Sequence, residues 1–381
     1  MTQRSRRAIV RRFAAFFVLL LCLAGQGCAV SHGPSVEEMA GAMIMTGFRG
    51  TEAPPSVLQA VSEGKIGGII LFEKGRNPGE PYNIESPGQL KRLVDSLQNA
   101  APRTLLVAVD QEGGQVCRLK TTRGFAALPS AAEMGRHDAA EVWTLGYRAG
   151  REMASLGINV DLAPVADIRR SAQSPGLGDA GRLFGDDPEK VTRLALSFGD
   201  GLFQAGVLPA LKHFPGLGSA GKDSHLSLPD VTDSWSREEL LPYGTAFAGD
   251  WPGMVLVAHV YNRNLDENLP SSLSPAVVDG LLRGELGWSG VVISDDLQMG
   301  AAAEGHSLEE RVRLALLAGN DILLFGNYLE HDPLLHERLF QAVTALVKEG
   351  VVPVERLKIS WRRIEAMKKR LAEAQKAAAS K

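Results

Sequence analysis

Residues 291–325 read VVISDDLQMGAAAEGHSLEERVRLALLAGNDILLF. An apolar run at Val291–Ile293 ends before two acidic residues, an amphipathic stretch occupies Leu308–Ala318, and a second apolar run covers Ile322–Phe325. Short apolar runs predict buried strands, and the stretch between them has the periodicity of a helix. Two such strands joined by a helix predict a right-handed βαβ unit, in which the strands are parallel.

The same alternation extends along most of the chain. Further candidate strands are Ile69–Phe72, Leu105–Val109, Val160–Pro164, Leu208–Leu211 and Met254–Ala258, with a weaker one near Met43–Thr46. Candidate helices are Pro87–Asn99, Asp138–Leu156, Glu189–Ala205 and Pro275–Leu286. Eight strands over this length predict an α/β fold, a closed (β/α)8 barrel of the TIM type in a single domain. An open doubly wound sheet is the alternative, but no Gly-x-Gly-x-x-Gly follows the first strands. We expect the Ala- and Lys-rich end, residues 372–381, to fray from a final helix.

Composition excludes several classes of protein. The chain has 381 residues, of which 45% are hydrophobic, and 41 Gly and 3 Cys, which excludes collagen-like, disordered and disulfide-scaffold chains. Five of its 41 Lys and Arg residues, and none of its 44 acids, lie in residues 1–27. The remainder therefore carries 36 basic against 44 acidic residues, a net charge of −8. Such an acidic protein is a poor candidate for binding nucleic acid, whose phosphates require a clustered basic surface.

The first 27 residues have the order of a bacterial secretion signal. A basic end is followed by an apolar run, Phe13–Ala24, and by small residues that precede Cys28. We expect residues 1–27 to be removed, Cys28 to become the lipidated first residue, and residues 28–381 to form the barrel domain. Cleavage without lipidation is the alternative. The prediction is an exported protein of the periplasm or cell envelope, held on a membrane by its lipid.

The use of cysteine agrees with this interpretation. Cys22 lies inside the signal and is lost with it, so the mature chain keeps Cys28 and Cys117. If Cys28 carries lipid, no disulfide is available despite export. We therefore expect Cys117 to be a small buried residue.

Charged or imidazole side chains follow most of the predicted strands. They are Asp110, Asp167, Lys212, His213, His259, Asp295 and Asp296. In a barrel the C-terminal ends of the strands converge on one face, where the active site lies. A single acid after a strand is explained equally well as a helix cap. Capping does not explain a lysine and two histidines, so the pattern predicts an active site at this face.

Five segments make the chain recognisable. They are DQEGGQVCR at 110–118, DLAPVAD at 161–167, GRLFG at 181–185, KHFPGLGSAGKDSH at 212–225 and VVISDDLQMGA at 291–301. In this order and spacing they resemble the single-domain β-N-acetylglucosaminidases of glycoside hydrolase family 3. The 212–225 block separates this subgroup from the two-domain β-glucosidases of the same family. Leu217 stands where the subgroup commonly has His, and Gln115 where it frequently has Arg.

The resemblance implies a retaining exo-β-N-acetylglucosaminidase that removes a terminal, non-reducing N-acetylglucosamine from peptidoglycan-derived muropeptides or related glycosides. Asp295 would be the nucleophile that forms a covalent glycosyl intermediate, and Asp296 a structural neighbour. Asp223 and His225 would be the acid/base. Retention of configuration needs a nucleophile and a proton donor about 5 Å apart. Because Asp223 and His225 are two residues apart, an extended backbone would point both side chains the same way.

The other matching residues would hold the sugar. The resemblance gives Asp110, Arg118, Arg182, Lys212 and His213 contacts with the N-acetylglucosamine hydroxyls. Both arginines could at the same time form ordinary ion pairs with a barrel acid, Asp110 or Asp167. His259 has weaker motif support, and we expect it behind the residues that touch the sugar.

Neither a cofactor nor a metal is expected, because glycoside hydrolysis needs no cofactor and the histidines at 213, 225 and 259 lack ligand spacing. Two other functions remain open. One is transfer of the glycosyl unit to phosphate, since a histidine acid/base avoids the repulsion that a carboxylate exerts on a phosphate dianion. The other is a non-catalytic lipoprotein that binds the cell wall.

Overall fold

The computed structural model describes residues 33–75, 82–170, 177–220 and 228–380. The predicted signal, Cys28 and the Asp223–His225 pair lie outside the described residues. Residues from Val36 onward form one compact unit.

A sheet of eight strands forms the centre of this unit. The strands are β1 (Ile44–Thr46), β2 (Gly68–Ile70), β3 (Leu106–Val109), β6 (Val160–Asp161), β7 (Leu208–Phe214), β8 (Met254–Val257), β9 (Val292–Ser294) and β10 (Leu323–Phe325). Neighbouring strands are parallel, and β1 pairs with both β2 and β10. A parallel bridge between Ile293 and Ile322 joins β9 to the start of β10 and closes the barrel. The predicted (β/α)8 barrel is therefore confirmed.

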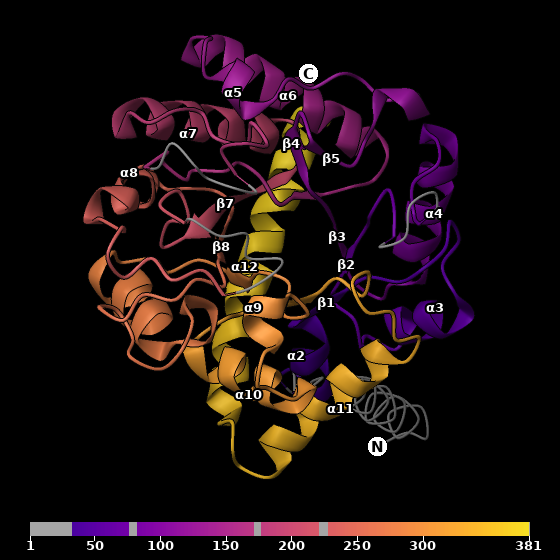
Figure 1. Cartoon of the computed structure of the whole chain (residues 1–381). Helices are drawn as coiled ribbons and strands as arrows, with labels where there is room; N and C mark the ends of the chain where they lie inside the picture. The colour runs from indigo at the N-terminus through magenta and orange to yellow at the C-terminus, as the bar shows by residue number, and fades with distance from the viewer. Residues whose placement is uncertain (1–32, 76–81, 171–176, 221–227, 381) are drawn as a thin grey trace, which may run out of the picture. The chain divides into compact units, whose positions relative to one another are not determined.

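Helices surround the strands (Figure 1). The outer helices are α3 (Pro55–Ser62), α4 (Pro87–Ala100), α6 (Ala139–Ser155), α7 (Pro188–Gln204), α8 (Leu241–Ala248), the π-helix η4 (Ala276–Glu285), α10 (Leu308–Ala318) and α11 (Leu335–Lys348). Shorter pieces are η1 (Thr121–Arg123), α5 (Ala131–Met134), η2 (Arg237–Leu240), η3 (Ser271–Leu273) and α9 (Gly300–Ala303). Capping fixes several starts, as where Asp138 and Glu141 form a capping box at α6.

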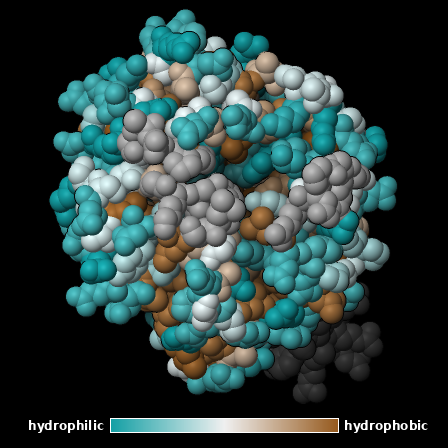
Figure 2. Space-filling model, in the orientation of Figure 1, coloured by the Kyte–Doolittle hydropathy of each residue, from teal (hydrophilic) through white to brown (hydrophobic). Residues whose placement is uncertain are grey.

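The strands bury both of their faces, as parallel strands covered by helices do. On β3, Leu106 and Ala108 pack in the cluster that fills the barrel, whereas Val107 and Val109 pack with residues of the surrounding helices. The helices in turn present polar residues outward, and hydrophilic side chains dominate the surface over α5, α6 and α7 (Figure 2).

Among the described residues, no helix is both long and apolar enough to cross a membrane. Cys117 is buried and free, as expected.

A short hairpin was not predicted. Strands β4 (Gln111–Gly113) and β5 (Val116–Cys117) are antiparallel and follow β3 directly. Their strands are only two and three residues long and contain no apolar run, so periodicity gives no signal for them. Gly113 and Gly114 take positive φ values of 94° and 59°, which a turn of this kind requires. The hairpin brings the chain back, so that the backbone N–H of Arg118 donates to the carbonyl of Asp110 at 3.2 Å.

Helix α12 (Val354–Ala379) passes behind the strands in Figure 1 and contacts residues that precede β7, β8 and β10. The expectation that residues 372–381 fray is wrong for the described part. The helix continues to Ala379 because its last turns are held by the barrel. Arg151 of α6 donates to the carbonyl of Ala378 at 3.0 Å, and Gln375 donates to the carbonyl of Gly206 at 3.3 Å.

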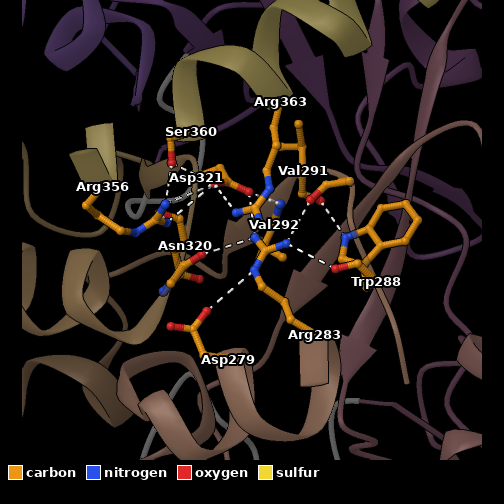
Figure 3. A network of polar contacts seen from close by, with 12 residues as sticks. Asp279, Arg283, Trp288, Val291, Val292, Asn320, Asp321, Arg356, Ser360 and Arg363 are labelled. Atoms are coloured by element: carbon orange, nitrogen blue, oxygen red, sulfur yellow. Dashed lines mark hydrogen bonds and ion pairs between the residues drawn. The ribbon is translucent and has the colours of Figure 1, made fainter. Parts of the chain in front are cut away.

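A buried carboxylate fastens α12 to the barrel (Figure 3). The side chain of Asp321, just before β10, is fully buried. It accepts hydrogen bonds from Ser360 Oγ at 2.6 Å, from Arg283 Nη2 at 2.7 Å and from the N–H of Val292 at 3.0 Å. Arg363 and Arg356 of α12 approach it at 3.2 and 3.4 Å. The carboxylate of Asp321 therefore connects η4, β9 and α12 to the start of β10.

Candidate active site

The C-terminal ends of the strands open into one pocket. All of the predicted site residues that the structure describes line it: Asp110, Arg118, Arg182, Lys212, His213 and Asp295. Apolar side chains from inside the barrel line its inner part, among them Ile70, Leu162, Leu256 and Leu324. The structure therefore brings together side chains that are spread over 186 positions of sequence, from Asp110 to Asp295.

Two cations hold Asp110 at the end of β3. Arg118 Nη2 donates to Asp110 Oδ2 at 2.9 Å, and Lys212 Nζ donates to Oδ1 at 3.0 Å. Arg118 also reaches Glu73, with 3.4 Å between Nη1 and Oε2. The pairing expected for Arg118 is thus present, and every oxygen of Asp110 has a fixed donor.

Glu112 is a central residue that the sequence analysis did not single out. Arg182 donates to it through two bonds of 2.7 Å, from Nε to Oε2 and from Nη2 to Oε1. Lys212 Nζ lies 2.7 Å from Glu112 Oε1 and so stands between Glu112 and Asp110. The expectation that Arg182 pairs with Asp110 or Asp167 is therefore wrong. A signal was available, because positions 110 and 112 fall on the same side of an extended chain.

Burial and charge compete in this cluster. The side chains of Glu112 and Lys212 are only 2% and 3% exposed. Burial alone would raise the pKa of Glu112, but the charges of Arg182 and Lys212 outweigh it and hold the pKa below its usual value. The pKa of Asp110 is lowered in the same way, against burial, by Lys212 and Arg118. Both carboxylates are therefore ionised acceptors at neutral pH, with their positions fixed before any ligand arrives.

His213 is oriented by Asp167. Its Nδ1 lies 2.6 Å from Asp167 Oδ2, and its Nε2 lies 3.4 Å from Arg182 Nη2. The carboxylate therefore fixes the orientation of the imidazole, with Nε2 turned toward Arg182. Asp167 also accepts from the N–H of Leu217 at 2.7 Å. The oxygens of Asp167 are therefore occupied by His213 and by the N–H of Leu217, which is why Asp167 does not bind Arg182.

Asp295 follows β9 and faces the pocket. Its N–H donates to the carbonyl of Val257 at 2.9 Å, and its Oδ1 accepts from the N–H of Asp296 at 2.8 Å. Burial would raise the pKa of Asp295, but the neighbouring His259, His213 and Lys212 and the backbone hydrogen bond hold it below the usual value. A carboxylate that stays ionised and remains partly exposed to a pocket is what nucleophilic attack requires.

Comparison with known proteins places this site in a family. The family model described as "Glycosyl hydrolase family 3 N terminal domain" matches residues 35–367. The chain belongs to glycosyl hydrolase family 3. A β-hexosaminidase of Alkalilimnicola ehrlichii is 37% identical over 300 residues, which are 76% of this chain and 82% of that protein.

Similar solved structures agree with this assignment. A β-N-acetylglucosaminidase from Paenibacillus sp. superimposes with a TM-score of 0.82 at 34% identity, covering 89% of this chain and 63% of that chain. A β-N-acetylhexosaminidase from Beutenbergia cavernae gives 0.78 at 28% identity, covering 88% and 99%. These findings confirm the predicted family and the predicted enzyme class, a glycoside hydrolase whose relatives are β-hexosaminidases.

Two further acids of this family 3 chain support the strand ends around the pocket, and one of them, Asp296, also lines it. Asp296 Oδ1 accepts from the N–H groups of Gln298 at 3.0 Å and Gly326 at 2.9 Å, so it ties the loops after β9 and β10 together. Asp161, at the end of β6, is fully buried and accepts from the N–H of Gln111 at 2.9 Å. Burial, with added repulsion from neighbouring carboxylates, raises the pKa of Asp161 to about 8.

His259 lies behind the pocket. It is fully buried, its Nδ1 lies 2.6 Å from Ser272 Oγ, and its Nε2 lies 2.9 Å from the carbonyl oxygen of Asp296. The described residues contain no group of three or more metal-ligating side chains.

Aromatic side chains complete the wall and were also not predicted. Phe72 and Tyr328 line the pocket with their ring centroids 4.2 Å apart. The guanidinium of Arg118 lies 5.3 Å from the centre of the Phe72 ring. Their positions, one past β2 and one past β10, follow the same strand-end rule as the charged residues. The rule was applied only to charged and imidazole side chains, so it passed over these two.

Proposed function

We propose that this protein is a retaining exo-β-N-acetylglucosaminidase that removes a terminal, non-reducing N-acetylglucosamine. The observation that carries the proposal is Asp295, an ionised carboxylate that faces a pocket walled by fixed hydrogen-bonding groups. The relatives support the same specificity, since those compared above are named as a β-hexosaminidase, a β-N-acetylglucosaminidase and a β-N-acetylhexosaminidase.

The form of the pocket supports action at a chain end. Side chains that fill the barrel, such as Leu162 and Leu256, also line the pocket and close it from below. A pocket closed at its inner end admits the end of a glycan but not its middle. We therefore infer that one terminal sugar is removed at a time.

The proposed reaction has two steps. Asp295 attacks the anomeric carbon and forms a covalent glycosyl–aspartate bond while the glycosidic C–O bond breaks. His225, oriented by Asp223, gives a proton to the departing oxygen. The same histidine then takes a proton from water, which attacks the anomeric carbon and releases Asp295. Two inversions give net retention.

The fixed charges would bind those hydroxyl groups of the N-acetylglucosamine that do not take part in the reaction. Asp110 and Glu112 can accept hydrogen bonds from hydroxyl groups, and Lys212, Arg118 and Arg182 can donate them. Contacts of this kind that strengthen as the sugar ring distorts lower the activation free energy for cleavage of the glycosidic bond. Because their partners already hold these groups in place, little reorganisation accompanies the reaction.

Hydrolysis is favoured over transfer to phosphate. Among the described residues that line the pocket, every lysine and arginine is already paired with Asp110 or Glu112. A phosphate dianion would have to compete with these carboxylates and approach the ionised Asp295. Water meets no such repulsion.

The natural substrate and place of action extend the proposal further. We infer that the sugar comes from peptidoglycan-derived muropeptides, and that the enzyme is exported to the cell envelope and anchored by lipid at Cys28. This part rests on the resemblance of the motifs and on the order of residues 1–28. Mass spectrometry of the mature N-terminus from cells tests the anchor, and an unmodified Cys28 would refute it.

One kinetic comparison tests the activity itself. Nitrophenyl β-N-acetylglucosaminide and nitrophenyl β-glucoside are compared as substrates, with and without phosphate, using wild type and Asp295→Ala. We expect strong preference for the acetamido sugar, free N-acetylglucosamine as product and no turnover by the variant. Equal rates on the glucoside would refute the specificity, and a sugar 1-phosphate product would refute hydrolysis. Full activity of the variant would refute the role of Asp295.

A further inference from the structure

A tight turn of residues 215–219 directly follows β7, which ends at Phe214, one residue beyond His213. The N–H of Leu217 donates to Asp167 Oδ1 at 2.7 Å, and the next N–H, that of Gly218, donates to Glu239 Oε2 at 3.1 Å. Two successive amides are thus held by two different carboxylates. Because Leu217 lines the pocket, the turn is also part of its wall.

The two glycines of this turn are packed so closely that neither could carry a side chain in place. A Cβ on Gly216, which has φ of +125°, would lie 2.5 Å from Glu239 Oε2. A Cβ on Gly218 would lie 1.8 Å from the carbonyl oxygen of Ile168. Glu239 therefore packs tightly against one side of the turn, and the backbone after β6 packs tightly against the other. The backbone has no room to shift without moving the carboxyl group.

Glu239 belongs to a segment that cradles the turn. Trp235 Nε1 donates to the carbonyl of Pro215 at 3.0 Å, and Ser234 Oγ donates to the carbonyl of Ser219 at 3.2 Å. Glu239 supplies the acceptor between these two points. It is only 1% exposed and does not line the pocket, so it acts on the turn and not on a ligand.

The surroundings of Glu239 favour a neutral carboxyl group. The charged and titratable groups that face it are Asp167 after β6, Arg170 beyond it and Tyr243 on α8. Arg170 is engaged with the neighbouring Glu238, at 2.5 Å. Burial, followed by repulsion from Asp167, raises the pKa of Glu239 to about 7. An amide side chain of the same shape should therefore replace it with little loss.

We propose that Glu239 is a positioning residue for the acid/base: it fixes the turn from which the segment carrying Asp223 and His225 continues. The inference rests on the proposed function, because it takes those two residues to supply the proton. A shift of a catalytic group by about 1 Å can cost about 10²-fold in rate. Loosening the turn should therefore impair proton transfer while leaving Asp295 in place.

The leaving group of the substrate separates these two effects. Dinitrophenolate departs without a proton, whereas methoxyphenolate needs one. The ratio kcat/KM reports formation of the glycosyl intermediate, in which the proton is donated. A defect in the acid therefore appears on the methoxyphenyl substrate and hardly at all on the dinitrophenyl substrate. A general loss of structure lowers kcat/KM for both.

The test compares Glu239→Ala, Glu239→Gln and Glu238→Ala on the two β-N-acetylglucosaminides, with His225→Ala as the reference. For Glu239→Ala we expect about 10- to 100-fold loss on the methoxyphenyl substrate and less than about 3-fold on the dinitrophenyl substrate. Glu239→Gln should stay within about 3-fold of wild type on both, because its amide oxygen still accepts from Gly218. Glu238→Ala removes an exposed neighbour on the same short helix, η2, and should change neither rate.

The outcomes distinguish the proposal from the function on which it rests. If His225→Ala shows the leaving-group dependence and Glu239→Ala does not, the role of Glu239 is overturned and the acid/base assignment stands. If His225→Ala itself lacks the dependence, that assignment fails and the role of Glu239 fails with it. If Glu239→Ala does not fold, Glu239→Gln decides, and a loss above 10-fold on both substrates overturns the proposal.

Discussion

Replacing Asp321 by Asn removes the one charge that the buried network of Figure 3 shares, at almost constant volume. The variant keeps an oxygen that can accept from one side, but it turns an NH₂ group toward donors on the other. Arg283, Arg356 and Arg363 then lose their common counter-charge. We expect a large loss of stability, because these arginines and Ser360 connect η4 and α12 to the start of β10.

The size of the loss follows from the burial. Removing one partner of a buried ion pair costs about 3–5 kcal/mol, because a buried charge is left uncompensated. Arg283 is 10% exposed and cannot reach water easily, whereas Arg356 and Arg363 are 15% and 23% exposed and can in part. This places the expected cost at the lower end, about 3 kcal/mol. Such a loss is a substantial fraction of the 5–15 kcal/mol that typically stabilises a protein.

The assay is equilibrium unfolding in urea, followed by circular dichroism, with Asp250→Asn as the control. Asp250 pairs with Arg370 of the same helix at 3.2 Å, but its side chain is 87% exposed. Its positive φ of 57° suits Asn as well as Asp. An exposed pair contributes less than about 1 kcal/mol. If Asp321→Asn is no more destabilised than the control, the reasoning from burial is refuted.

The difference in unfolding free energy between wild type and Asp321→Asn should also depend on pH. Burial would raise the pKa of Asp321, but the three arginines hold it below its usual value. A lowered pKa gives stability that is present above the unfolded value, about 3.9, and is lost as the pH falls through the folded value. The gap between wild type and Asp321→Asn should therefore be constant from about pH 7 to pH 5 and narrow below about pH 4. A gap that widens in acid would contradict this assignment.

Three further variants probe the pocket. Asp295→Asn should lower kcat/KM on nitrophenyl β-N-acetylglucosaminide by at least about 10³-fold with an unchanged melting curve, since it removes the nucleophile alone. Lys212→Met should lower kcat/KM by about 10²-fold, because Asp110 and Glu112 lose their shared cation; activity near that of wild type would refute the role of this cluster. Asp161→Asn should increase stability at pH 7 by about 2–4 kcal/mol and have no effect near pH 4, as urea unfolding at both values will show. The sign follows because a raised pKa gives stability that is present below about 3.9 and lost as the pH rises toward about 8.

The barrel could be predicted because each strand is an apolar run with charged neighbours. Buried parallel strands need side chains that are apolar on both faces, and this leaves a signal in four or five residues. The predicted ends of the strands agree less well with the structure. The run at Val160–Pro164 suggests five residues, but β6 ends at Asp161, whereas β7 continues to Phe214 through Lys212 and His213. Polar residues that continue a strand into an active site cannot be told from the start of a loop.

The residues of the pocket could be predicted by type and position, but their partners could not. Arg182 had two nearby acids as candidates, and it pairs with neither. Asp167 is taken by the imidazole of His213 and the N–H of Leu217, and a fully buried carboxylate with three donors has no room for a guanidinium. Which donor reaches which acceptor depends on distances across the barrel, and no local pattern records these.

Glu112 shows what the sequence could have revealed and what only the fold adds. Alternation along an extended chain places it beside Asp110, and this could have been read from DQEGG. Two carboxylates so close repel each other, and one would ordinarily take up a proton. Lys212 and Arg182 prevent this, but they reach Glu112 only because β7 and the 181–185 segment converge on the same end of the barrel. The closed barrel is thus what allows two adjacent acids to remain ionised, and their ionisation is what would make them acceptors for a sugar.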